Sequence, residues 1–185
     1  MSLMPLSDSS FEKPYPKWLE STERLRDGTE IRLRPLRPED EPLLHDLVAH
    51  MSPEDLRLRF FAAVRGLSHA VAARLSHIDY DRAMALLAEK DGVALGVARF
   101  FADSDRRRAE FAIAVRSDWK GHGLGYLLMT RLIAVAREWR IGELVGQVLR
   151  ENRPMLAMCR ELGFTVATDP TDASVMQVRK VLPAG

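Results

Sequence analysis

Cysteine is nearly absent from this sequence, since Cys159 is the only one among 185 residues. An intrachain disulfide is therefore impossible, and a zinc site built from several cysteines is excluded. The five histidines contain no His-x-x-x-His pair, so the sequence predicts no metal site. A single cysteine fits a reducing compartment, and we expect a cytoplasmic protein.

Long hydrophobic runs and an excess of charge of either sign are also lacking. No apolar stretch approaches the ~18 residues that a membrane-spanning helix needs. Prolines and charged residues such as Pro5 and Glu12 interrupt the first twenty residues, where a signal peptide would need a hydrophobic block. The 27 Lys and Arg residues nearly balance the 26 Asp and Glu residues. This balance gives no electrostatic reason to expect a membrane surface or a nucleic acid as partner.

The periodicity of the chain predicts one domain after a short tail. Residues 1–27 are rich in serine, proline and charge without a period, which predicts a tail or linker before a domain at 28–185. Alternation and apolar runs predict strands at 31–36, 83–89, 93–101, 109–115 and 144–149, with two more opening at Phe164 and Val175. Apolar stripes predict helices at 38–51, from Ser52, at 68–78, from Gly125 to about residue 140, and at 154–162. Three consecutive strands with short links indicate an antiparallel meander, in a mixed α/β (α+β) fold.

The most informative stretch is residues 109–125, which read as strand, turn, glycine-rich loop and helix. Gly121, Gly123 and Gly125 alternate with other residues, so the backbone can approach a ligand closely. The helix that follows adds four unpaired N–H groups and a partial positive charge, which predicts a pyrophosphate cradle. The spacing is not that of a Walker loop, and Tyr126 stands where a dinucleotide fingerprint needs its third glycine. Taken alone, these glycines also fit a structural turn.

The loop and six other segments, two of which overlap, carry a resemblance to a known family. Residues 120–125 (Lys-Gly-His-Gly-Leu-Gly) resemble the Gln/Arg-x-x-Gly-x-Gly/Ala loop of the GNAT acetyltransferases, with Lys120 in place of the usual Gln or Arg. Residues 152–164 resemble that family's later Asn-to-Gly-Phe segment. More narrowly, the sequence is similar to the bacterial protein-lysine acetyltransferases called Pat, at residues 34–41, 58–61, 79–82, 109–112 and 148–156.

The resemblance implies a single GNAT domain, whose mixed, largely antiparallel central sheet is splayed open and flanked by helices on both faces. It implies acetyl-CoA as the acyl donor, without a metal. The residues expected at acetyl-CoA are Ile113, Ala114, Val115, Lys120, Gly121, His122, Gly123, Leu124, Gly125, Tyr126 and Asn152. For Asn152, a role as helix N-cap is an equal alternative.

Glu110 is the residue that the resemblance implies as catalytic. Acetyl transfer needs a neutral amine, whereas a lysine with a pKa of ~10.4 is almost fully protonated at pH 7. A general base within reach can remove that proton. Glu110 shares a strand face with Ala112 and Ala114, and these small residues leave room for a pantetheine arm. The alternative is that Glu110 is simply the polar face of a half-exposed strand, paired with an arginine.

The resemblance implies N-acetylation of a protein lysine, with an AMP-forming acyl-CoA synthetase as the acceptor and direct transfer from acetyl-CoA. The alternatives are acetylation of a small-molecule amine and a non-catalytic module that senses acyl-CoA. Cys159 stands where many GNAT enzymes have a tyrosine general acid, but its residue type favours a small buried hydrophobe. Whether the chain is a stand-alone protein or part of a longer one stays open.

Three further segments have mainly structural interpretations. We expect residues 58–61 to supply core side chains and a salt bridge. Residues 79–82 fit either the acceptor groove or a structural turn. Arg106 to Arg108 are expected at a solvated rim, with contact to the adenosine 3′-phosphate as the alternative.

Overall fold

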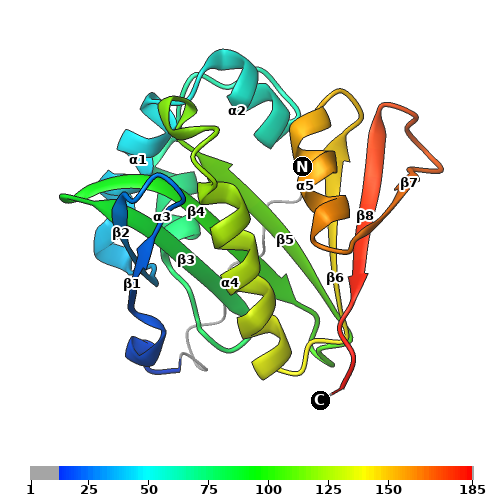
Figure 1. The fold of residues 1–185 in the computed structure, drawn as a ribbon, viewed down its shortest axis with the longest axis horizontal. Helices are drawn as coiled ribbons and strands as arrows, with labels where there is room; N and C mark the ends of the chain where they lie inside the picture. Colours follow the sequence, from blue (N-terminus) through cyan, green and yellow to red (C-terminus); the bar gives the residue numbers. More distant parts are fainter. Residues whose placement is uncertain (1–12, 185) are drawn as a thin grey trace.

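An eight-stranded sheet runs through residues 13–184, the part of the chain that the computed structural model describes (Figure 1). The strands are β1 (Ser21–Arg24), β2 (Glu30–Pro35), β3 (Ala83–Lys90), β4 (Val93–Ala102), β5 (Arg108–Val115), β6 (Glu143–Leu149), β7 (Thr165–Thr168) and β8 (Val175–Val181). Their order in the sheet is β1-β2-β3-β4-β5-β6-β8-β7. The β5–β6 pair is parallel and the others are antiparallel, which confirms the mixed fold class and the meander of β3, β4 and β5.

Helices cover both faces of this sheet. They are α1 (Glu41–Ala49), α2 (Pro53–Phe60), α3 (His69–Ser76), α4 (Leu124–Glu138) and α5 (Arg153–Glu161), with short 3-10 turns η2 (Lys17–Leu19), η3 (Pro38–Asp40) and η4 (Ser117–Trp119). The side chain of Ser52 caps α2 by accepting the N–H of Asp55, and Ser68 caps α3 in the same way. The strands and helices predicted from the sequence all occur, within two residues of their predicted bounds except at the start of α1, where the 3-10 turn η3 occupies the first three predicted helical residues.

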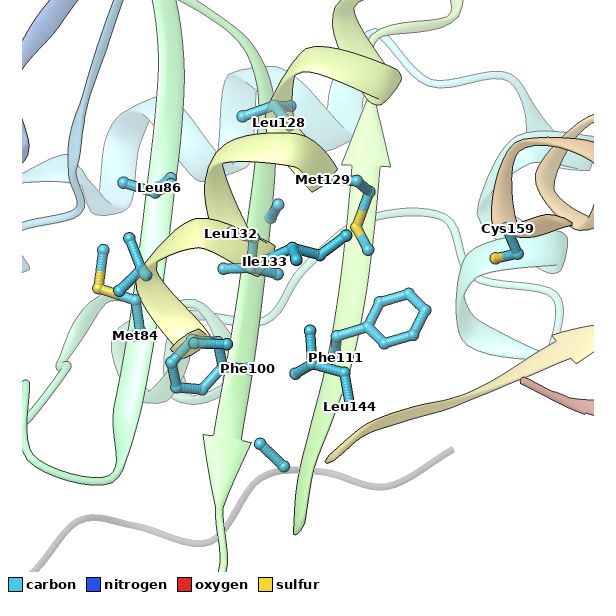
Figure 2. Packing of buried hydrophobic residues seen from close by; sticks show 14 of the residues in the cluster. Met84, Leu86, Phe100, Phe111, Leu128, Met129, Leu132, Ile133, Leu144 and Cys159 are labelled. Carbon is cyan, nitrogen blue, oxygen red and sulfur yellow. The ribbon is translucent and has the colours of Figure 1, made fainter. Parts of the chain in front are cut away.

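The main core lies between α4 and one face of the sheet. Leu128, Leu132 and Ile133 recur at helical spacing on α4 and are almost fully buried. Figure 2 shows them on the side of α4 that faces the sheet, in the same cluster as Met84, Leu86 and Phe100. On the opposite face, α1 and α3 cover a second apolar cluster formed by other residues of β3 and β4. The sheet therefore presents two distinct faces along β4 and β5, and the even-numbered residues of β5 lie on the second.

Two elements within residues 1–27 were not predicted. The turn η2 and the strand β1 both precede residue 28, and β1 forms an antiparallel hairpin with β2. Residues 1–12 of the predicted tail lie outside the described part of the chain. The sequence missed β1 because its Ser-Thr-Glu-Arg side chains form an edge strand without a hydrophobic pattern. Its position is fixed by pairing with β2 rather than by burial.

β5 and β6 run side by side over only three residue pairs, from Arg108↔Glu143 to Glu110↔Val145. Beyond Glu110, β5 is paired with β4 alone among the described residues. The ring of Phe111 follows at once, against Gly146 of β6 and 5.3 Å from the ring of Phe164. A Cβ atom added at Gly146 would lie 2.7 Å from Cε1 of Phe111. The aromatic ring thus fills the angle where the two strands separate.

We expect Gly146→Ala to lower the free energy of unfolding by about 1–3 kcal/mol, because the added methyl group overlaps a ring that cannot move freely. Chemical denaturation measures this effect. The matched control is Gly66→Ala, where an added Cβ has no atom within 4 Å, and a change within about 0.5 kcal/mol is expected there. Equal stability of the two variants would contradict this account of the strand separation.

Candidate active site

The separation of β5 from β6 opens into a cleft of about 480 Å³. Its walls come from β5, the loop before α4, the first turns of α4 and α5, and helix α2. Figure 1 shows α2 at the end of the sheet where β5 and β6 lie farthest apart. Most of the residues predicted from the sequence line this cleft: Glu110, Ile113, Ala114, Val115, Lys120, Gly121, Gly123, Leu124, Gly125, Tyr126 and Asn152.

His122 is the predicted residue that does not line the cleft. Its ring lies 5.1 Å from the ring of Trp119, and its Nδ1 is 3.1 Å from the Asp27 carboxylate. The side chain is therefore directed to the hairpin between β1 and β2. A contact of His122 with a cofactor stays a prediction.

The backbone of β5 presents polar groups to the cleft. The N–H of Arg116 donates to the carbonyl of Leu95, on the β4 side. Backbone groups point to alternate sides along an antiparallel strand. Those of Ile113 and Val115 therefore point away from β4, toward the gap where β6 has diverged. They can accept and donate hydrogen bonds to an extended ligand lying in that gap.

The glycine loop places the start of α4 at the end of the gap between β5 and β6. Gly121 and Gly123 both have φ of 82°, a left-handed conformation that favours glycine. No side chain caps the first turn of α4, and that turn contains no acidic residue. Its free N–H groups and the helix dipole therefore suit an anion such as a phosphate. Gly125, the second residue of α4, lies close to Met158 and Ile113, so that an added Cβ atom would be in ordinary van der Waals contact with both side chains.

Lys120 joins this loop to α2. Its Nζ lies 2.6 Å from Oδ1 of Asp55, whose Oδ2 accepts a hydrogen bond from Ser117. On the other side of α2, Arg57 forms an ion pair with Glu151, just before α5. Helix α2 is thus connected by ion pairs to both sides of the cleft, at the loop before α4 and at the start of α5. The charge of Lys120 is already neutralised by Asp55, and its contact with a cofactor stays a prediction.

Asn152 and Cys159 have clear structural roles on α5. Oδ1 of Asn152 accepts the N–H of Met155, so Asn152 is the N-cap of the helix and also lines the cleft. Cys159 has no exposed surface and belongs to the main core. Burial raises the pKa of its thiol to about 11. The interpretation of Cys159 as a small buried hydrophobe is confirmed.

Glu110 lies in the cleft at the last paired position between β5 and β6. Among residues 13–184, no hydrogen bond or ion pair engages its partly buried carboxylate. Burial raises the pKa of this carboxyl group, while the nearby charge of Arg59 opposes the rise. Within those residues no arginine forms an ion pair with Glu110, so the arginine pairing that the structural alternative expected is not found there. A free carboxylate with a raised pKa is suited to accept a proton.

Sequence reasoning missed two arginines beside Glu110. Arg99 lies in the middle of β4 with 3% of its surface exposed, and Arg59 lies on α2. The salt bridge expected within residues 58–61 is not formed by Arg59 with any described residue, because the acidic partners on α2 bind Lys120 and Arg57 instead. Arg99 could have been noticed as a charge within the otherwise apolar strand 93–102.

The other candidate segments are structural in the described residues. Oδ1 of Asp79 accepts the N–H groups of residues 81, 82 and 83, which forms a turn away from the cleft. Arg106, Arg107 and Arg108 pair with Asp81, Asp105 and Glu143 respectively. Within residues 13–184, no helix has the length and apolar character to cross a membrane, and no cluster of His, Cys, Asp or Glu is suited to a metal ion.

Comparisons with known proteins agree with this geometry. The sequence model of the Acetyltransferase (GNAT) family matches residues 51–164. Acetyltransferase PA5475 of Pseudomonas aeruginosa is 33% identical over 161 residues, which cover 85% of each chain. Acetyltransferase Pat of Mycolicibacterium smegmatis is 30% identical over 143 residues, or 76% of this chain and 43% of that protein. The chain thus spans less than half the length of that relative.

Two solved structures share the fold. The GNAT domain of S. lividans PAT superposes with a TM-score of 0.86 and 28% identity, covering 91% of this chain and 99% of that one. The structure of yncA from Salmonella typhimurium, solved with its cofactor acetyl-CoA, has a TM-score of 0.64 at 20% identity and covers 84% of this chain and 95% of that one. At that identity the second likeness concerns the fold alone.

Proposed function

This chain belongs to the GNAT family of acetyltransferases, and from that premise we propose that it transfers the acetyl group of acetyl-CoA to a protein lysine, with Glu110 as general base. The observation that carries the proposal is the unpaired carboxylate of Glu110 inside the cleft where β5 leaves β6. The likeness to the GNAT domain of S. lividans PAT supports a protein acceptor. We further propose that the protein acts in the cytoplasm.

The cleft fits acetyl-CoA as the donor substrate. The uncapped first turn of α4, reached through Gly121 and Gly123, would hold the pyrophosphate. The backbone groups of Ile113 and Val115 would hydrogen-bond the pantetheine arm, as a further strand would do at a sheet edge. Partly buried residues of β5, among them Ala112 and Ala114, leave the width that this arm requires.

In the proposed reaction, the carboxylate of Glu110 accepts a proton from the lysine ammonium group, directly or through one water. The neutral amine then attacks the thioester carbon, so that a C–N bond forms, the nitrogen loses a second proton to solvent and the C–S bond breaks. CoA leaves as a thiolate, which solvent protonates. A covalent acyl-enzyme is not proposed, because Cys159 is buried in the core and does not line the cleft.

The proposed acceptor is the lysine of an AMP-forming acyl-CoA synthetase. The basis is the resemblance of five sequence segments to Pat proteins, together with the similarity to two proteins that carry that name. Acetylation would remove the positive charge of that lysine and so inactivate the synthetase. A small-molecule amine is the second candidate, and it is favoured by the two arginines, Arg59 and Arg99, that line the cleft with Glu110.

The acceptor class can be tested with radiolabelled acetyl-CoA and a cell extract divided into protein and small-molecule fractions. We expect label in a protein band with the wild type and none with Glu110→Gln, and mass spectrometry would then identify the lysine. Label that appears only in the small-molecule fraction would contradict the protein acceptor and leave acetyl transfer intact.

A further inference from the structure

Arg99 and Arg59 form a positively charged wall on the Glu110 side of the cleft. In the β4–β5 ladder, Arg99 lies opposite Ala112, and Phe101 lies opposite Glu110. Side chains two residues apart on a strand share a face, so Arg99 projects from the same face as Glu110. Ala112 is about 7 Å from Glu110 along β5. Arg59 reaches this region from α2, where its charge acts on Glu110.

The guanidinium groups of both arginines retain unused donors. Arg99 donates one hydrogen bond, from Nη1 to the carbonyl of Leu75 at 2.9 Å. In the described residues, no fully buried side-chain nitrogen or oxygen lacks a partner, so the remaining donors of Arg99 are not sealed in the core, and Arg99 is among the residues that line the cleft. Arg59 forms no ion pair or hydrogen bond within residues 13–184, and its guanidinium lies over the ring of Phe60.

Arg34 is a second buried arginine in this fold, and it differs from Arg99 because its charge is neutralised by carboxylates. It is 6% exposed, and it binds Asp40 at 2.7 Å and Glu89 at 3.1 Å. Arg99 is buried more deeply and has no carboxylate partner among the described residues. Burial, followed by repulsion from Arg59, lowers the pKa of Arg99 to about 9. A buried cation without an anion is costly, so this wall favours binding of an anionic group.

The other charges around the cleft do not neutralise the wall. Asp55 and Lys120 compensate each other, while Arg26 and Glu161 are exposed at the rim. This leaves two arginines against the single carboxylate of Glu110, which is an excess of one positive charge. The phosphates of acetyl-CoA would not supply the missing anion, because their proposed site is at the opposite end of the β5 segment, beyond Val115.

We propose that the acceptor carries a carboxylate close to its reacting amine, and that Arg99 and Arg59 bind this carboxylate while Glu110 receives the proton of the amine. The inference rests on the proposed function and narrows its acceptor to a carboxylate-bearing amine. A guanidinium group offers a planar fork that matches a carboxylate in a bidentate contact. The carboxylate comes either from a free amino acid or from an acidic side chain beside an acceptor lysine.

The first experiment compares matched acceptors with and without the carboxylate. One arm measures kcat/KM for each of the twenty L-amino acids against its carboxamide. The other arm uses lysine peptides with glutamate or glutamine at the neighbouring positions. We expect the carboxylate form to be preferred by about 30-fold, equivalent to about 2 kcal/mol at 1.4 kcal/mol per factor of ten. The arm in which this preference appears identifies the source of the carboxylate.

The second experiment uses variants. Arg99→Gln and Arg59→Gln are each expected to bring the ratio of kcat/KM for the carboxylate and the amide close to one. The control is Arg106→Gln, which should retain the wild-type ratio, because Arg106 pairs with Asp81 away from the cleft. Titration calorimetry of the same probes into the CoA-loaded protein provides a measurement that does not depend on turnover. If Arg99→Gln fails to fold, Arg59→Gln on α2 provides the test.

Equal use and equal binding of carboxylates and amides by the wild type would overturn the proposal. The same holds for a preference that both arginine variants retain. Binding that depends on Arg99 without acetylation of any probe would support the anion site and count against acetyl transfer. These outcomes separate a failure of the inference from a failure of the proposed function.

Discussion

The Glu110→Gln variant is expected to lower kcat by about 10²–10⁴-fold, the range that a positioned general base contributes. Glutamine has nearly the same size but cannot accept the proton of the amine. The KM for acetyl-CoA should change little, because the proposed donor contacts come from α4 and from the backbone of β5. Steady-state kinetics with a fixed acceptor measure both quantities. The matched control is Glu138→Gln at the exposed end of α4, which should retain full activity.

The pH profile gives this prediction a second readout. Glu110 acts only as a carboxylate, and burial raises the pKa of its carboxyl group above the ordinary value of 4.5. Wild-type activity should therefore rise with pH through that raised pKa and be lost below it. The glutamine variant should lack this acidic limb, and its residual rate should increase toward the amine pKa of ~10.4. A variant that retains both the rate and the acidic limb would show that Glu110 is not the base.

The second large effect is expected from Gly125→Asp. Gly125 has ordinary helical backbone, and an added Cβ would meet Met158 and Ile113 only at 3.6 Å or more. The fold should therefore accept a side chain at this position. An aspartate would bring a negative charge to the proposed phosphate site at the start of α4. We expect the KM for acetyl-CoA to rise by about 100-fold relative to Gly125→Asn, which corresponds to about 2.8 kcal/mol of repulsion.

The Gly125→Asn variant isolates the charge, because asparagine and aspartate have almost the same shape. Both variants should have similar midpoints of thermal unfolding, since the two side chains have the same size and the added Cβ introduces neither backbone strain nor overlap. The expected difference should shrink as salt is added, because ions screen the repulsion of a partly exposed charge. Equal KM values for the two variants would place the phosphates away from the first turn of α4.

Most strands and helices of the fold can be predicted from local hydrophobic patterns in the sequence. The alternation over residues 109–115 and the apolar stripe after Gly125 predict β5 and α4, because burial of one face imposes a period on each element. The glycine loop between them and the position of Glu110 follow from the same patterns. β1 could not be predicted, because an edge strand of polar residues is fixed by hydrogen bonds to β2 and leaves no periodic signature.

The tertiary structure alone decided which charges are paired and where the sheet opens. Lys120 meets Asp55, and Arg34 meets Asp40 and Glu89, whereas Arg99 meets no carboxylate among the described residues. Such pairings join segments far apart in the chain, so they depend on how α2 and β4 pack rather than on any local sequence. The opening beside Glu110 likewise depends on Phe111 lying against Gly146. The sequence by itself determined the elements and the chemical groups of the site, while packing determined which groups remain free to act.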